Sequence, residues 1–384
     1  MFVRTPPRFA LVAGLTAVSA LTLAGCSGSA PQTAGDGPSV VTTTTQVTDF
    51  TQRLLEGVDA SITNLLGPGR SVHSFEATPA DLAAIAAADA VVVSGAGLEE
   101  WLDDTLAAAG YTGPVIDAST GIELGGSHHH DHGTEDGHDH GGEDGHDHGT
   151  EGEDGHDHST EGEDGHDHGA EATTPEPTAE ASTGAEDDHD HEGTNPHIWT
   201  APTNAERMVA NIAEGLAALE GVDASTIEAN AAGYTAKLAE LDAWITENMA
   251  KVPVEKRLLV TNHDGLYYYD RAYDITFVGS VMPSWDDNAE PSAADIDALV
   301  AAIREHGVTA VFTETQLSPE AIERIGAETG ATVYSGEDAL YTDALGEAGS
   351  AGASYIGATA HNTNVLIEAW GATPSELPAG LVDA

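Results

Sequence analysis

The sequence predicts an α/β protein with two lobes, each built around a parallel sheet covered by helices, and one long helix that joins them. Three observations support this fold class. Short apolar runs alternate with helical patterns in both halves of the 384-residue chain. Residues 127–193 interrupt the first half with a composition that cannot form a core. A helical pattern over Ala224–Met249 would span roughly 40 Å, the length of a small domain.

The first half is expected to begin at Ser39 and to alternate strands with helices. The run Ala90–Ser94 contains three consecutive valines, so this strand is apolar enough to be buried on both faces, as in parallel sheets. Gly110 is expected to end the helix before it. We predict strands over Ser39–Thr44, Ser61–Leu66, Ala90–Ser94 and Pro114–Asp117, and helices over Val47–Gly57, Pro79–Ala87 and Leu98–Ala109.

Ordered structure is expected to resume at Asn195 and to alternate in the same way. Leu238, Leu241 and Ile245 form one apolar stripe on the long helix. We predict helices over Asn204–Leu219, Ala224–Met249, Tyr267–Ala272, Ser292–His306, Pro319–Thr329 and Ala351–Trp370, and strands over Arg257–Thr261, Ile275–Val278, Thr309–Phe312 and Thr332–Tyr334. The expected domains are an N-terminal lobe over residues 39–222, a linker helix over 223–250, a C-terminal lobe over 251–373 and a tail over 374–384.

The chain begins with the features of an export signal. Arg4 and Arg8 precede the apolar run Phe9–Leu23, which contains no charge and is too short for a stable membrane span. We therefore expect residues 1–25 to be a signal peptide.

A lipid-attachment signal follows directly. The run ends in Leu23-Ala24-Gly25-Cys26, which resembles a bacterial lipobox, a signal in which the cysteine is acylated. Cys26 is the only cysteine, so no intramolecular disulfide can form. Residues 26–38 are rich in Ser, Gly, Ala and Pro and are expected to be a tether. We predict a protein held by a lipid on the extracytoplasmic face of the cell membrane.

The charge balance excludes one class of partner. The chain has 12 basic and 65 acidic residues and a formal net charge of −53. Nucleic acid phosphates would be repelled by such a protein, whereas cations would be attracted.

The segment 127–193 consists almost wholly of His, Asp, Glu, Gly and Thr, followed by a stretch rich in Thr, Pro, Ala and Glu. Its repeated Glu-Asp-Gly-His-Asp-His unit offers imidazole beside carboxylate, which suits divalent zinc, and we expect a disordered insert that binds additional ions weakly. Whether it delivers, buffers or regulates zinc stays open. Fourteen of the 19 histidines lie here: His128, His129, His130, His132, His138, His140, His146, His148, His156, His158, His166, His168, His189 and His191.

Three further histidines stand at the ends of predicted elements. His73 follows the second predicted strand, His197 lies where the ordered pattern resumes, and His263 follows the strand that ends at Thr261. Ligands of parallel α/β sheets bind outside the carboxyl ends of the strands, so these side chains from both halves are candidates for one common site.

Several segments, in order, resemble the zinc and manganese solute-binding lipoproteins of ABC importers, over nearly all of Val40 to Gly371. The segments that carry the resemblance are Val72-His73-Ser74-Phe75-Glu76-Ala77-Thr78-Pro79; Gly95, Gly97, Leu98, Glu99 and Trp101-Leu102; Pro196-His197-Ile198-Trp199 with Pro202, Asn204 and Asn211-Ile212; His263 with Tyr269 and Glu290-Pro291-Ser292; and Val311-Phe312-Thr313-Glu314 with Tyr355, Asn362 and Leu366. The resemblance implies two α/β lobes bridged by a rigid helix, with the metal in the cleft between them.

The resemblance also implies four metal ligands. They are His73, His197, His263 and Asp338, with Glu337 as the alternative carboxylate, because members often have Asp-Pro-Leu where this chain has Asp338-Ala339-Leu340. Asn195 stands where many members have Asp. Three imidazoles and a carboxylate suit tetrahedral zinc, whereas family members that carry manganese usually have Glu in place of the third histidine.

We therefore expect a monomeric carrier that captures Zn²⁺ and delivers it to an ABC permease with its ATPase, and not an enzyme. A zinc hydrolase is disfavoured because the sequence has neither a His-Glu-x-x-His motif nor a nucleophile elbow. A manganese or iron carrier of the same family, and a surface zinc sink or adhesin without an import role, remain the alternatives.

Overall fold

The computed structural model describes residues 37–73, 75–126, 194–282 and 291–382. The predicted signal peptide, the predicted lipidation site Cys26 and the histidine-rich segment 127–193 lie outside the described residues. None of the helices in the described ranges combines the length and the apolar character that a membrane crossing needs.

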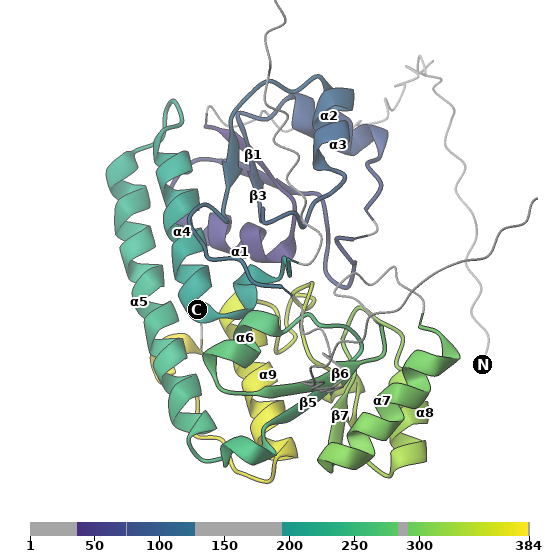
Figure 1. Ribbon diagram of the computed structural model, residues 1–384. Coiled ribbons are helices and arrows are strands. Elements are labelled where there is room, and N and C mark those ends of the chain that lie inside the picture. The colour runs from purple at the N-terminus through teal and green to yellow at the C-terminus, as the bar shows by residue number, and fades with distance from the viewer. Residues whose placement is uncertain (1–36, 74, 127–193, 283–290, 383–384) are drawn as a thin grey trace, which may run out of the picture.

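The N-terminal lobe is a four-stranded parallel sheet in the order β2-β1-β3-β4, with helices packed on it (Figure 1). Val41 of the central strand pairs with Thr63 on one side and Val91 on the other. The strands are β1 Ser39–Thr42, β2 Ser61–Asn64, β3 Ala90–Val93 and β4 Val115–Asp117, and the helices of this lobe are α1 Thr45–Leu54, α2 Pro79–Ala86, α3 Leu102–Ala109 and α4 Pro202–Ala217.

Helix α3 starts four residues later than its apolar pattern predicts. Gly95, Ala96 and Gly97 all have left-handed backbone conformations, with φ values of 79°, 57° and 78°. The buried carboxylate of Glu99 accepts hydrogen bonds from the backbone N–H groups of Ser94 and Gly95. The segment before Leu102 is therefore a turn held by a side chain, which a hydrophobic pattern cannot distinguish from helix.

Helix α5, Ala224–Met249, runs beside α4 and extends along both lobes (Figure 1). It contacts α1 in the first lobe and α9 (Tyr355–Ala369) in the second. Leu238, Leu241 and Ile245 are fully buried, which confirms the predicted apolar stripe.

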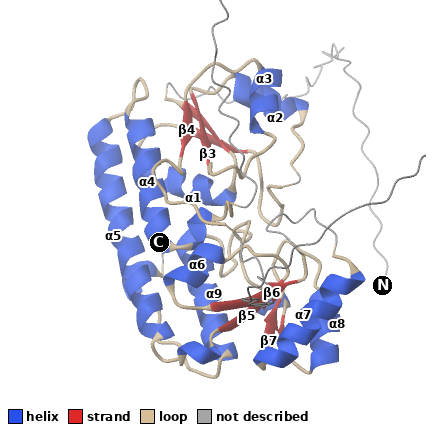
Figure 2. Cartoon of the chain, in the orientation of Figure 1, coloured by secondary structure: helices blue, strands red, loops and turns tan. Residues whose placement is uncertain are grey.

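The C-terminal lobe contains two parallel strand pairs, β5-β6 and β7-β8, with β5 beside β7 (Figure 2). The strands are β5 Leu258–Thr261, β6 Thr276–Ser280, β7 Ala310–Phe312 and β8 Thr332–Tyr334; the remaining helices are α6 Tyr267–Ala272, α7 Ala293–His306, α8 Glu320–Thr329 and α9, with short 3₁₀ turns η1 Ile198–Thr200, η2 Val254–Lys256, η3 Gly336–Asp338 and η4 Ala379–Leu381. The predicted fold class, two α/β lobes with parallel sheets joined by a long helix, is confirmed.

Local signals fix the ends of these helices. Ser292 and Asp295 form a reciprocal capping box at the start of α7, and Gly307 ends it with φ of 68°. Helix α9 starts at Tyr355, later than the predicted Ala351, because Ser354 caps it by accepting the N–H of Gly357.

Candidate metal centre

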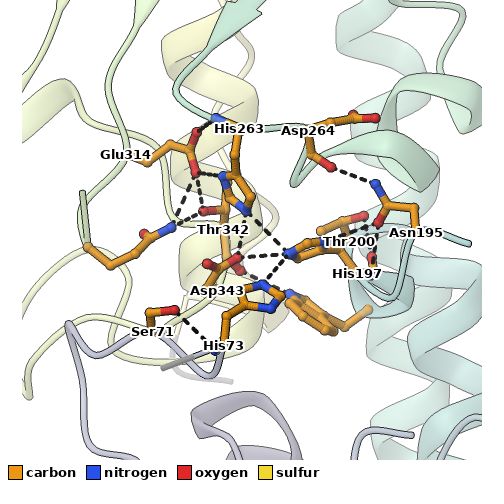
Figure 3. Close-up of polar contacts among 12 residues, drawn as sticks. Ser71, His73, Asn195, His197, Thr200, His263, Asp264, Glu314, Thr342 and Asp343 are labelled. Carbon is orange, nitrogen blue, oxygen red and sulfur yellow. Dashed lines mark hydrogen bonds and ion pairs between the residues drawn. The ribbon is translucent and has the colours of Figure 1, made fainter. Parts of the chain in front are cut away.

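Four side chains from separate loops converge between the lobes (Figure 3). His73 lies in the loop that follows β2, His197 immediately precedes η1, His263 follows β5, and Asp343 lies beyond η3. Each contributes one ligand atom, and these atoms all lie within 4.8 Å of one another. The structure thus brings together the three histidines expected from the sequence.

The spacing of the four atoms fits a single small ion. Nε2 of His197 lies 3.4 Å from Nε2 of His73, 3.2 Å from Nε2 of His263 and 3.1 Å from Oδ1 of Asp343. The His263 Nε2 to Asp343 Oδ1 distance is 3.2 Å. Ligands at 2.0–2.1 Å from a tetrahedral zinc ion would be separated by about 3.3–3.4 Å. The donor set and these four distances therefore suit a four-coordinate zinc ion.

Neither the expected fourth ligand, Asp338, nor its alternative, Glu337, belongs to this group. Both lie in η3, outside the group of four, and the carboxylate comes from Asp343. A β-bridge between Glu314 and Leu340 holds the segment after η3 at the edge of the sheet, and only beyond it does the chain reach the three histidines.

A sequence signal for Asp343 was present but overlooked. Asp343-Ala344-Leu345 has the same Asp-x-Leu spacing as the Asp338-Ala339-Leu340 segment, and it lies five residues later. The sequence alone offers two equivalent candidates, and the bridge at Leu340 decides between them.

His197 is held in one tautomer by Asn195. The side-chain oxygen of Asn195 accepts the backbone N–H of His197 at 3.0 Å and lies 2.9 Å from its Nδ1. The amide nitrogen of Asn195 donates to the carbonyl oxygen of Asp264 at 2.6 Å, which identifies the other atom as the acceptor. Nδ1 of His197 therefore carries the proton, and the lone pair of Nε2 faces the site.

His263 is oriented by the buried carboxylate of Glu314. Oε2 of Glu314 lies 2.6 Å from Nδ1 of His263, and Oε1 accepts the backbone N–H groups of Asn262 and His263, each at 2.9 Å. A Cβ atom at Gly265 would lie 2.6 Å from Cε1 of the His263 ring, so glycine at this position leaves the space that the imidazole occupies. This carboxylate–histidine pairing is the usual support of a metal-binding imidazole.

The Asp343 loop is tied to the N-terminal lobe. The carbonyl oxygen of Thr342 accepts hydrogen bonds from Gln46 at 3.2 Å and from the Trp199 indole at 3.0 Å, and the N–H of Leu345 donates to Thr45 Oγ1 at 2.8 Å. Among the described residues, Oδ2 of Asp343 is buried without a hydrogen-bond partner. Because no donor there competes for it, this oxygen could coordinate a bound cation together with Oδ1.

His73 is the more accessible member of the group. Its backbone N–H donates to Ser71 Oγ at 3.1 Å, and its side chain is only partly buried, whereas the other three side chains are fully buried. An ion entering from solvent therefore meets His73 before the remaining ligands.

The two buried histidines differ in charge. Burial lowers the pKa of His197 to about 4, although the nearby Asp343 opposes the shift. Burial also acts against protonation of His263, but the carboxylates of Asp343 and Glu314 outweigh it and raise the pKa of His263 well above its ordinary value. The site thus holds a neutral His197 and a proton on His263 that a metal ion would have to replace.

Comparisons with known proteins agree with this picture. Residues 40–369 match the family model described as zinc-uptake complex component A, periplasmic. The manganese-binding lipoprotein MntA of Halalkalibacterium halodurans is 25% identical over 91% of this chain and 95% of its own. The iron-binding protein YfeA of Yersinia pestis is 26% identical, covering 91% and 90%.

A zinc-binding relative also has a solved structure. The zinc-binding protein TroA of Treponema pallidum is 24% identical over 88% of this chain and 90% of its own. The structure of that periplasmic protein superposes with a TM-score of 0.65 at 21% identity, over 87% of this chain and 99% of the other.

Proposed function

Because this chain belongs to the family of the periplasmic component A of zinc-uptake complexes, we propose that it captures zinc outside the cell and delivers it to an ABC permease. The chain is the metal-binding extracytoplasmic component of an ABC importer, and it is not an enzyme. The observation that carries the choice of zinc is the convergence of three imidazole nitrogens and one carboxylate oxygen within 4.8 Å of one another.

The donor types favour zinc over the harder ions. Manganese prefers oxygen ligands, and this group supplies nitrogen from His73, His197 and His263 with oxygen from Asp343 alone. A manganese or iron carrier is the alternative, because relatives named for each of those metals match most of the chain. The buried second oxygen of Asp343 would favour that alternative by adding one more oxygen ligand.

Cargo carriage also agrees with the closed character of the group. All four coordination positions of a zinc ion would be filled by protein, whereas a catalytic zinc keeps one position for water. Release to a permease then requires the ligands to separate. Because His73 and His197 belong to one lobe and His263 and Asp343 to the other, a relative movement of the lobes would open the group.

We place the protein at the outer face of the cell membrane, attached through a lipid on Cys26, with an ABC permease and its ATPase as partners. Support comes from the Leu23-Ala24-Gly25-Cys26 motif and from relatives named as lipoproteins of ABC transporters. The histidines of segment 127–193 would bind further zinc ions more weakly than the cleft. A surface zinc sink is the outcome if these histidines hold most of the metal.

The test is the number of zinc ions that the full chain retains against a chelator of moderate affinity. We expect one retained zinc per chain, lost in His263→Ala, and only slight displacement by excess manganese. Preferential retention of manganese would identify manganese, and not zinc, as the cargo. Several retained ions that survive His263→Ala would instead locate the tight binding in segment 127–193 and favour the sink.

A further inference from the structure

The two ends of segment 127–193 meet at a small hydrogen-bonded junction. Gly126 and Thr194 form an antiparallel bridge, and the N–H of Asn195 donates to the carbonyl oxygen of Gly125 at 2.8 Å. These residues flank the segment on either side, so the described chain stops and resumes at one place.

The hydroxyl of Tyr268 closes this junction from α6. It accepts the N–H of Gly125 at 3.1 Å and donates to the carbonyl oxygen of Asn195 at 2.7 Å. A single side chain of the C-terminal lobe therefore bonds to both ends of the junction. Removing its oxygen would break both bonds while leaving the ring in place.

Asn195 connects the junction to the metal ligands. Its side chain and backbone are fully buried, and each of its four polar groups is used: N–H to Gly125, C=O from Tyr268, amide N–H to Asp264, and amide oxygen from His197. Asp264 directly follows the ligand His263 in sequence. Asn195 thus contacts the segments that carry one ligand from each lobe.

Close packing makes the junction sensitive to small changes. A Cβ atom added at Gly125 would lie 2.7 Å from Cε1 of the neighbouring Tyr267 ring. The junction backbone therefore sits against α6 with no space for a methyl group. A displacement there would pass to Asn195 through the 2.8 Å backbone bond.

We infer that Asn195 and Tyr268 are positioning residues, and that through them the junction flanking segment 127–193 supports the metal site. The hydroxyl of Tyr268 fixes the Asn195 backbone, and the Asn195 amide fixes the His197 ring with its Nε2 directed at the cargo ion. Metal affinity in the cleft then depends on the junction, independently of the histidines within the segment. This inference rests on the proposed function, since it concerns the same site.

The first test removes one hydroxyl from the full chain. Tyr268→Phe is expected to weaken binding of the tightly held cobalt or zinc ion at least about 2- to 12-fold. That factor corresponds to the net contribution of one hydrogen bond, and this variant loses two. The matched control is Tyr273→Phe, which removes another buried hydroxyl near α6, one that donates to Asp242 on α5 at 2.7 Å. Its affinity should equal that of the unaltered chain.

A spectroscopic readout separates positioning from general destabilisation. Cobalt in a four-coordinate site absorbs visible light much more intensely than cobalt in six-coordinate sites, so the band reports the geometry of the cleft. We expect Tyr268→Phe to shift or broaden this band at saturation, and Tyr273→Phe to leave it unchanged. If the Tyr268 hydroxyl only stabilised the fold, Tyr268→Phe would lower thermal stability and leave the band unchanged.

Three further variants test the other residues of the junction. Asn195→Leu removes the acceptor of His197 and is expected to lower affinity about 10- to 100-fold, the usual effect of losing a partner of a metal-binding histidine. Asn195→Asp restores that acceptor but loses the donor to the Asp264 carbonyl oxygen, so it should recover only part of the loss. Gly125→Ala, which alters neither Asn195 nor Tyr268, should weaken the cleft in the same direction as Tyr268→Phe.

The outcomes distinguish the two proposals. His197→Ala should abolish the intense cobalt band; if the unaltered chain shows no such band, the proposed function fails. If the band is present and depends on His197, but Tyr268→Phe and Gly125→Ala match the unaltered chain in affinity and spectrum, the positioning role is wrong and carriage stands.

Discussion

Among the described residues, each lobe has one buried glutamate beyond the carboxyl ends of its strands, and the two glutamates have different hydrogen-bond partners. Glu99 in the N-terminal lobe accepts the hydroxyl of Thr43 at 2.6 Å and the N–H groups of Ser94 and Gly95. Glu314 in the C-terminal lobe also accepts backbone N–H groups, those of Asn262 and His263, but its second oxygen contacts the His263 ring.

The difference shows how a buried carboxylate that accepts backbone N–H groups can also take part in metal binding. In both lobes a buried carboxylate satisfies N–H groups that the end of a strand leaves without ladder partners. The Glu99 carboxylate contacts only the turn before α3 and Thr43 among the described residues. Burial raises its pKa despite those hydrogen bonds. The Glu314 carboxylate contacts the ring of His263, which belongs to the proposed metal site. Removing this carboxylate should therefore change metal binding as well as stability.

The largest effect is expected within the C-terminal lobe, from Asp343→Ala. Removal of one of four ligands should lower zinc affinity at least about 100-fold, because the ion then has an open position and the buried histidines lose their compensating charge. Asp338→Ala should remain within about twofold of the unaltered chain. Zinc competition titrations measure both. Equal losses in the two variants would contradict the placement of the fourth ligand.

The comparison of the two glutamates is tested next by Glu314→Gln and Glu99→Gln. We expect Glu314→Gln to lower zinc affinity about 10- to 100-fold, as do other losses of a carboxylate partner of a ligating histidine. Glu99→Gln should leave affinity unchanged, since Glu99 is not among the four ligands or their described partners. Calorimetric titration of both variants under one condition gives the ratio of their zinc affinities. A ratio near one would mean that the two glutamates do not differ in their effect on metal binding.

Glu99→Gln should instead reduce stability. The amide supplies one acceptor oxygen where the carboxylate supplied two, and its NH₂ group would face a buried backbone donor. We expect a loss of about 1–3 kcal/mol in the free energy of unfolding of the metal-free protein. Denaturant unfolding with a matched surface control, Glu220→Gln, provides the measurement; no loss relative to that control would mean that the turn does not need the carboxylate.

The smallest effect is a pH dependence of zinc affinity of about tenfold per pH unit. At neutral pH His197 is already neutral, because its pKa lies at about 4, whereas His263 holds a proton because its pKa is raised. Zinc must displace that proton, so affinity should rise with pH through the neutral range and level off above the raised pKa. Titrations from pH 6.5 to 8 measure the slope.

The matched control for this slope is Glu314→Gln, which removes one of the two carboxylates that raise the pKa of His263 and should flatten the dependence. The same linkage acts on the metal-free fold. Stability contributed by the protonated His263 is fully present below its unfolded pKa and is lost as the pH rises through the folded value. A slope that is unchanged in Glu314→Gln would assign the proton to another group.

Sequence periodicity and local chemistry determined most of the fold and three of the four grouped side chains. Alternating apolar runs predicted the parallel sheets, and the stripe of Leu238, Leu241 and Ile245 predicted the long helix. Histidines at the ends of predicted elements indicated three of the four grouped side chains. These features are local because a strand, a helix face or a strand end is defined by residues a few positions apart.

Tertiary structure decided the rest. Two equivalent Asp-x-Leu segments compete for the fourth position, and a long-range bridge between Glu314 and Leu340 is what leaves Asp343 in the cleft. The partners of the ligands, Asn195 with Tyr268 and Glu314 with His263, are 73 and 51 residues apart in the chain. Contacts at such separations depend on how whole lobes pack, and no window of sequence contains both partners.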